Sequence, residues 1–127
     1  MKNILIILLA FVTNLNAATY LCTANYQSHM GKLITDSDSD FVRKHKPYTK
    51  VIEGSRIVVQ RCSLPLLPTS APCDTYEVDK IEYDSNVQIR KYYIFKSQYD
   101  IQIFSDMTYV ENNGRGGLLI GSCKISQ

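Results

Sequence analysis

The residues best suited to recognition chemistry lie in a glycine-rich segment near the C-terminus, Asn113-Gly114-Arg115-Gly116-Gly117. The segment lacks the Gly-Lys-Ser/Thr ending of a phosphate-binding loop, which argues against nucleotide binding. Its glycines can supply the positive φ of a tight turn, so a hairpin is predicted here. Because turns carry recognition residues more often than strands do, Arg115 could make a bidentate contact with a carboxylate or phosphate. We take Asn113, Gly114, Arg115 and Gly116 as candidate binding residues.

A second candidate is the acidic alternation Asp36, Asp38 and Asp40, which resembles the start of a calcium loop. A calcium loop also needs glycine at its sixth position, where Phe41 stands, and an acid at its twelfth, where Pro47 stands. The segment therefore predicts a solvated acidic turn and no metal site. Its three carboxylates remain candidates for docking a cationic partner.

Catalytic chemistry finds little support in the sequence. His29 and His45 are the two histidines, neither lies in a nucleophile elbow or metal motif, and no Gly-x-Ser-x-Gly is present. A Ser-His-Asp site is defined by geometry and so stays open. We predict that the chain is not an enzyme and uses no cofactor. The basic segment 43–46 is interpreted as a solvated face, with weak attraction to polyanions as the alternative.

The elements that position these residues begin with the cysteines, Cys22, Cys62, Cys73 and Cys123. In an exported chain an even count indicates disulfides, and four cysteines allow three pairings. We favour Cys62 with Cys73, which closes a short local loop, and Cys22 with Cys123, which joins the two ends of the domain. Zinc is the competing interpretation, but the sequence has no Cys-x-x-Cys and no histidine at ligand spacing.

The N-terminus has the pattern of a secretory signal peptide. Lys2 precedes an apolar run over residues 4–12, and small residues follow it. The run is shorter than the roughly 20 residues that a membrane-spanning helix needs. We predict a signal peptide over 1–17, a single β-rich domain over 18–127, no transmembrane segment, and a periplasmic or secreted location.

Apolar residues alternate with polar ones over several short segments, which predicts strands. Residues 20–26, 55–62, 75–83, 87–95, 99–103, 107–111 and 118–125 are the expected strands. In the segment 87–95, Val87, Ile89, Tyr93 and Phe95 are expected to share the buried face. The segment 27–54 is the least regular and could hold one short helix. The fold class is therefore all-β, a small antiparallel barrel or sandwich built as a meander, with two disulfides.

The charge of the chain is close to neutral. The whole sequence has 14 Lys and Arg against 12 Asp and Glu, a net charge of +2. Loss of Lys2 with the signal peptide leaves 13 against 12, a net charge of +1. Nucleic-acid binders usually have a strongly basic footprint, so we expect no nucleic-acid partner.

The overall plan resembles the periplasmic C-type lysozyme inhibitors. The resemblance rests on an exported chain with Tyr20 and Cys22 at one end, Gly121 and Cys123 at the other, and a β-meander between them. It implies a small antiparallel barrel that docks a loop into the lysozyme cleft. The Ser-Gly-x-Lys/Tyr loop of that family is absent, and Ser97-Gln98-Tyr99 does not replace it, so no inhibitory residue is carried over.

Together these features predict a monomeric exported β-barrel that is not an enzyme and binds another macromolecule. Its partner would be a protein in the envelope or outside the cell, such as lysozyme or another cell-wall-active enzyme that it inhibits. The alternative is a carrier that holds a small apolar ligand inside the barrel, which would need a cavity of several hundred Å³.

Overall fold

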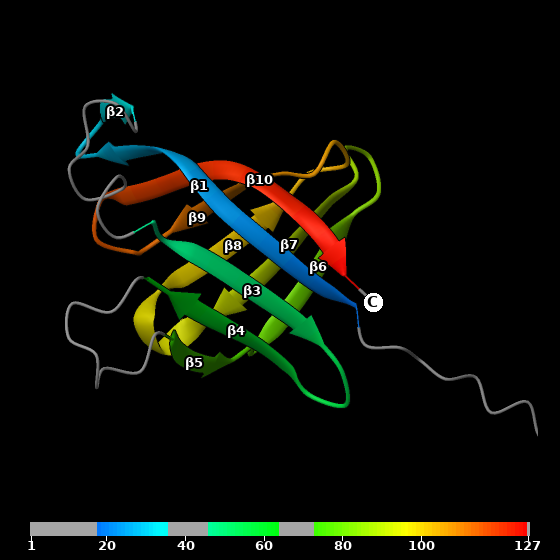
Figure 1. Ribbon diagram of the computed structural model, residues 1–127. Coiled ribbons are helices and arrows are strands. Elements are labelled where there is room, and N and C mark those ends of the chain that lie inside the picture. Colours follow the sequence, from blue (N-terminus) through cyan, green and yellow to red (C-terminus); the bar gives the residue numbers. More distant parts are fainter. Residues whose placement is uncertain (1–17, 36–45, 64–72, 127) are drawn as a thin grey trace, which may run out of the picture.

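In the computed structural model, a single curled antiparallel sheet forms a barrel-like body (Figure 1). The structure describes residues 18–35, 46–63 and 73–126, without the side chains of 33–35. The strands are β1 (Thr19–His29), β2 (Lys32–Thr35), β3 (Tyr48–Glu53), β4 (Ile57–Cys62), β5 (Cys73–Glu77), β6 (Lys80–Asp84), β7 (Ile89–Ile94), β8 (Tyr99–Ile103), β9 (Thr108–Asn112) and β10 (Gly117–Ser126). The 3₁₀ turn η1 (Phe95–Ser97) joins β7 to β8. The predicted all-β meander is confirmed.

The strand order places the two ends of the chain side by side. It runs β5-β4-β3-β1-β10-β9-β8-β7-β6, with β2 paired to β1 outside this path. The first long strand therefore lies between β3 and the last strand. Cys22 is directly opposite Cys123 in the β1–β10 pair, and the two form a disulfide. Cys62 is likewise opposite Cys73 in the β4–β5 pair and bonded to it. Both favoured cysteine pairings are confirmed.

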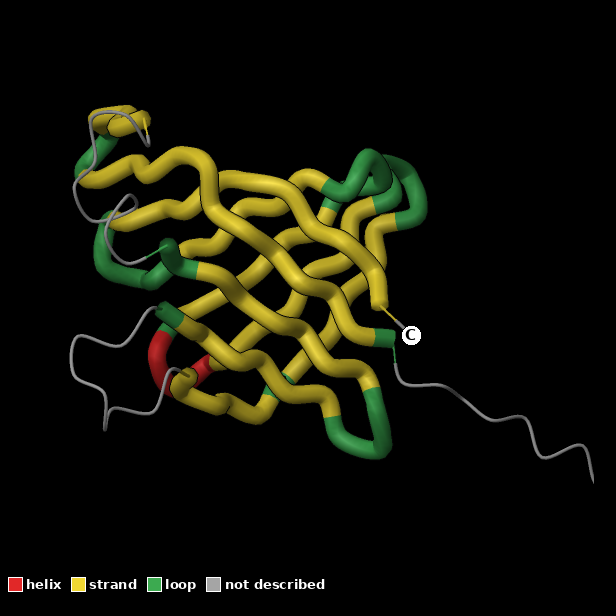
Figure 2. Tube along the Cα trace, in the orientation of Figure 1, coloured by secondary structure: helices red, strands yellow, loops and turns green. Residues whose placement is uncertain are grey.

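The two edges of the sheet are consecutive in the chain. β5 and β6 are separated only by Val78 and Asp79. The Val78 N–H donates to the Ile57 carbonyl next to β5, and the Asp79 N–H donates to the Tyr93 carbonyl next to β6. One bent segment thus carries the chain from one edge of the sheet to the other, and the strands of the front layer cross those behind (Figure 2). The single strand predicted over 75–83 is wrong in this respect, because the bend divides it.

The core lies between the layers and is rich in tyrosine. Tyr92, Tyr109, Ile101, Val51 and Val59 are fully buried, and the Cys22 side of the terminal disulfide lies among them. The alternation predicted for β8 is confirmed, since Tyr99, Ile101 and Ile103 all face inward. In β1 the inward face ends at Ala24, because the register with β10 shifts between Ala24 and Tyr26. No helix among the described residues is long and apolar enough to cross a membrane.

The predicted inner face of β7 is wrong. Val87 and Phe95 are 56% and 61% exposed, whereas Tyr92 and Ile94 are buried. Tyr92 can be buried because its hydroxyl donates a hydrogen bond to Glu53 on β3, which also accepts one from the exposed Arg90, whose Nη1 lies 3.1 Å away. The paired carboxylate thus lets a tyrosine occupy a buried position that the apolar pattern assigns to the outside.

Candidate functional site

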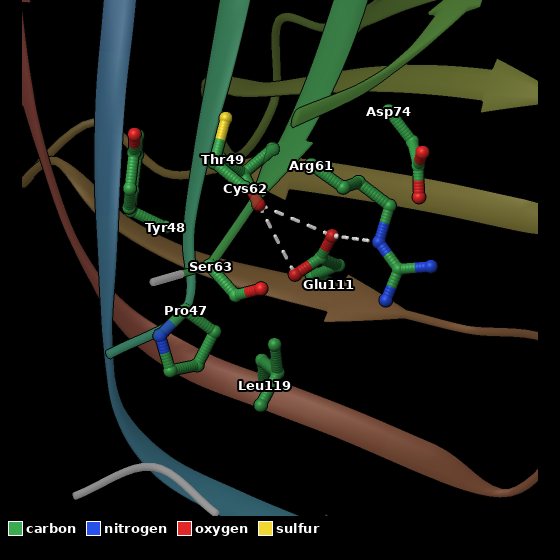
Figure 3. A pocket seen from close by; sticks show the side chains of 9 residues that line it. All are labelled: Pro47, Tyr48, Thr49, Arg61, Cys62, Ser63, Asp74, Glu111 and Leu119. Carbon is green, nitrogen blue, oxygen red and sulfur yellow. Dashed lines mark hydrogen bonds and ion pairs between the residues drawn. The ribbon is translucent and has the colours of Figure 1, made fainter. Parts of the chain in front are cut away.

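Glu111 on β9 is a buried carboxylate surrounded by hydrogen-bond donors from three other strands. Its carboxylate accepts hydrogen bonds from the Tyr99 hydroxyl and from Thr49, whose Oγ1 lies 3.2 and 3.3 Å from its two oxygens. The Nε of Arg61 lies 3.1 Å from Oε1 (Figure 3). Charges are fully buried only when they are paired, and these donors provide that pairing.

Burial of this cluster changes the titration of its tyrosines. Desolvation raises the pKa of the Tyr99 phenol well above its usual value, and the Glu111 carboxylate raises it further. Desolvation and Glu111 also raise the pKa of Tyr109. The Tyr109 hydroxyl is buried without a hydrogen-bond partner among the described residues. Both phenols therefore stay protonated and neutral beside the carboxylate.

A hollow of about 220 Å³ opens above this cluster. Glu111 and Thr49 lie at it together with Arg61 and Asp74, and the Cys62 end of the local disulfide forms part of its wall (Figure 3). Arg61 is 39% exposed, whereas Glu111 is 1% exposed. The guanidinium of Arg61 is therefore accessible to solvent, whereas the Glu111 carboxylate that neutralises its charge is buried.

The glycine-rich segment forms the predicted turn between β9 and β10. The Asn112 side chain accepts a hydrogen bond from the Gly114 N–H at 2.9 Å. The Asn113 side chain accepts from the N–H groups of Arg115 at 2.8 Å and Gly117 at 3.0 Å. Gly114 and Gly116 have positive φ, as the prediction requires.

Two neighbouring turns brace this one. A Cβ on Gly114 would lie 2.5 Å from the Gln98 carbonyl oxygen, so the turn packs directly on the backbone at the end of η1. On the other side the Met30 N–H donates to the Gly116 carbonyl at 3.0 Å. We call the surface formed by Met30–Gly31, η1 with Gln98, and Asn113–Gly116 the loop end of the barrel.

The loop end also brings Arg115 toward Arg61. A second hollow, of about 200 Å³, is lined by both arginines together with Asn113 and Tyr99. The candidate residues Asn113, Gly114, Arg115 and Gly116 are thus placed together, next to the Glu111 cluster.

Other candidates are placed less fully. Asp36, Asp38 and Asp40 lie outside the described residues, as do residues 43–45 of the basic segment. Lys46 is described and exposed, as is His29.

Sequence reasoning missed Arg61 and Glu111. A signal was present, because each lies two residues from an apolar residue of its strand, Val59 and Tyr109. A charge on an apolar face indicates a buried pair. The two residues are 50 positions apart, so the sequence does not show that they pair with each other.

Comparison with known proteins adds no family to this picture. No protein-family model, curated protein or solved structure matches the chain.

Proposed function

We propose that the chain is an exported binding protein, not an enzyme, and that it docks another macromolecule through its loop end. One observation carries the proposal: the Met30–Gly116 hydrogen bond holds two turns together and places Met30, which is 76% exposed, on the same surface as exposed Arg115. Methionine and arginine are both enriched at protein interfaces. A braced turn loses little entropy on binding, which favours affinity.

The disulfides support export. Both pairs are formed, and the described residues contain no free cysteine. Disulfides persist in oxidising compartments such as the periplasm or the extracellular space. The location agrees with the signal peptide predicted for residues 1–17.

The state of Glu111 supports binding rather than catalysis. A general acid or base must be able to reach a substrate proton. Glu111 is instead hydrogen-bonded by Thr49, Arg61 and Tyr99 beneath the surface. The group that this cluster presents to solvent is the Arg61 guanidinium, which can bind an anion and cannot exchange a proton near neutral pH.

The partner that we propose is a cell-wall-active enzyme such as lysozyme. Glycoside hydrolases carry two carboxylates in their cleft, and an exposed arginine such as Arg115 is complementary in charge to such a site. The interior of the barrel is filled by Tyr92, Tyr109, Ile101 and their neighbours, which leaves the carrier alternative without support.

The test is lysozyme turnover in the presence of the oxidised protein. We expect inhibition by the natural chain, a loss of at least about tenfold in affinity with Arg115→Glu, and no change with Arg56→Glu. Arg56 is a suitable control because it lies on the β3–β4 turn and pairs with exposed Glu77. Absence of inhibition at a large molar excess of the protein would reject the proposal that it inhibits lysozyme. Inhibition that is unchanged by Arg115→Glu would show that the contact with lysozyme lies outside the loop end.

A further inference from the structure

The hollow between Arg61 and Arg115 has the composition of an anion site. Five parts of the chain contribute to it: β4, β5, η1, β8 and the β9–β10 turn. Its lining residues are Arg61, Tyr76, Ser97, Tyr99, Asn113 and Arg115. Of these described lining residues, two are cationic, the other four are neutral groups able to form hydrogen bonds, and none is acidic. Glu111, which balances Arg61, belongs to the neighbouring hollow and not to this one.

Arg61 is held in a fixed orientation before any ligand arrives. Its Nε is bonded to Glu111, and its guanidinium carbon lies 4.9 Å from the centroid of the Tyr99 ring. These contacts use one donor and one face of the guanidinium. In Figure 3 the hydrogen bond to Glu111 comes from Nε, and one of the two terminal nitrogens points away from Glu111. A planar guanidinium presented in this way can bind a carboxylate through two parallel hydrogen bonds.

The hollow also has an aromatic wall. Tyr76 is partly exposed, and its ring stacks on that of Tyr99 with 6.3 Å between the centroids. At about 200 Å³ the hollow is smaller than the pockets of roughly 300 Å³ or more that hold drug-sized ligands. The occupant must therefore be small, with an anionic group near the arginines and a ring or apolar face against Tyr76.

We propose that this hollow binds a small carboxylic acid that carries a ring, with its carboxylate between Arg61 and Arg115 and its ring against Tyr76. This goes beyond the docking function, because the ligand is a free small molecule and the binding needs no macromolecular partner. A bound acid would occupy Arg115 and so would compete with any partner at the loop end.

The experiment is a calorimetric titration of the purified, oxidised chain with D-glucuronate, with D-glucose as the neutral matched probe and inorganic phosphate as the anion without a ring. We expect glucuronate to bind more tightly than phosphate and glucose not to bind. Arg115→Gln should weaken glucuronate binding about tenfold, the effect of losing a charge-assisted hydrogen bond. Tyr76→Leu should weaken glucuronate binding but leave phosphate binding unchanged. Arg56→Gln should change neither.

Several results would overturn the proposal: no glucuronate binding, equal binding of glucose, phosphate binding as tight as that of glucuronate, or no effect of Arg115→Gln. Arg61→Gln can perturb the fold through Glu111, so Arg61→Lys is the variant of choice at this position, with circular dichroism to confirm folding. The titration separates the two proposals. Glucuronate binding that depends on Arg115, in a protein that does not inhibit lysozyme, would support the carboxylic-acid site and reject the proposed inhibitor function.

Discussion

The Nε of Arg61 lies 3.1 Å from Oε1 of Glu111, and the pair spans the barrel from β4 to β9. The two partners differ in their surroundings, since Glu111 is 1% exposed and Arg61 is 39% exposed. The pair therefore joins the core to the loop end. The two residues therefore differ in how they tolerate loss of the partner. Without Glu111, Arg61 can turn toward water, whereas Glu111 without Arg61 stays buried.

The first prediction follows from this asymmetry. Arg61→Gln should lower the free energy of unfolding by about 3 kcal/mol, because it leaves a buried carboxylate without its cation. Glu111→Gln should cost only about 1–2 kcal/mol, because the amide keeps the shape and Arg61 can be hydrated. Urea denaturation of both variants at neutral pH measures the difference, with Arg56→Gln as the exposed control. Equal losses for Arg61→Gln and Glu111→Gln would contradict the role given to burial.

The second prediction concerns alkaline pH. Burial raises the pKa of Tyr92, Tyr99 and Tyr109, with further contributions from Glu53 on Tyr92 and from Glu111 on the other two. Above a pH of about 10 a tyrosine loses its proton in the unfolded chain but keeps it in the folded one. The folded state then binds more protons, so stability is complete below that pH and falls above it, by about 1.4 kcal/mol per pH unit for each such tyrosine.

Urea midpoints measured at several pH values between about 8 and 11 test this sign. Tyrosinate absorbance provides an independent readout, because these three buried phenols should lose their protons at a higher pH than tyrosine does in the unfolded chain. Tyr92→Phe, Tyr99→Phe and Tyr109→Phe should each reduce the alkaline slope. A stability that stays constant to pH 11 would exclude the raised pKa values.

The third prediction compares the disulfides. Cys22–Cys123 has a sequence separation of 101, whereas Cys62–Cys73 has a separation of 11. By the entropy of loop closure the long loop is worth about 4.7 kcal/mol and the short one about 3 kcal/mol. The double variant Cys22→Ala with Cys123→Ala should therefore lower the denaturation midpoint further than Cys62→Ala with Cys73→Ala. The opposite order would show that residual structure in the unfolded chain dominates.

Local patterns explain which parts of this fold could be predicted from the sequence. Tyr99, Ile101 and Ile103 alternate with polar residues, and that alternation predicted the strand. The structure places all three on its buried face. The cysteine pairs could also be inferred, because one encloses a short loop and the other joins the chain ends. These features depend on spacing within one segment or on the plan of the whole chain.

The parts that failed depend on contacts between distant segments. Glu53 pairs with Arg90 and Tyr92 from another strand, which reverses the face of β7. Val78 and Asp79 divide a strand because each pairs with a different edge of the sheet. The candidate site has one part of each kind. The turn that carries Arg115 could be predicted from its local sequence, whereas the Arg61–Glu111 pair could not.

The fourth prediction concerns close packing of the two terminal strands. A Cβ at Gly121 on β10 would lie 1.9 Å from the carbonyl oxygen of Thr23 on β1, so an alanine there must push backbone apart. Gly121→Ala should cost about 3 kcal/mol of stability. Gly31→Ala is the contrast: its Cβ would meet none of the described residues within 4 Å, and its positive φ opposes alanine at about 1 kcal/mol. Similar losses of stability for the two variants would mean that β1 and β10 are packed less tightly at Gly121 than the structure shows.

The fifth prediction tests whether the loop end is held in place by its asparagines. Asn113→Ala removes the acceptor for the N–H groups of Arg115 and Gly117, and amide hydrogen exchange at both should accelerate about tenfold, the equivalent of one turn hydrogen bond. Exchange at Gly114 should not change, because its acceptor is Asn112.

Asn112→Ala is the reciprocal control. It should accelerate amide exchange at Gly114 and leave exchange at Arg115 unchanged. Because binding by a loosened turn must first restore its order, Asn113→Ala should also weaken any ligand that Arg115 contacts, with little change in global stability. Faster exchange at Arg115 with unchanged affinity would show that binding at the loop end does not depend on a preformed turn.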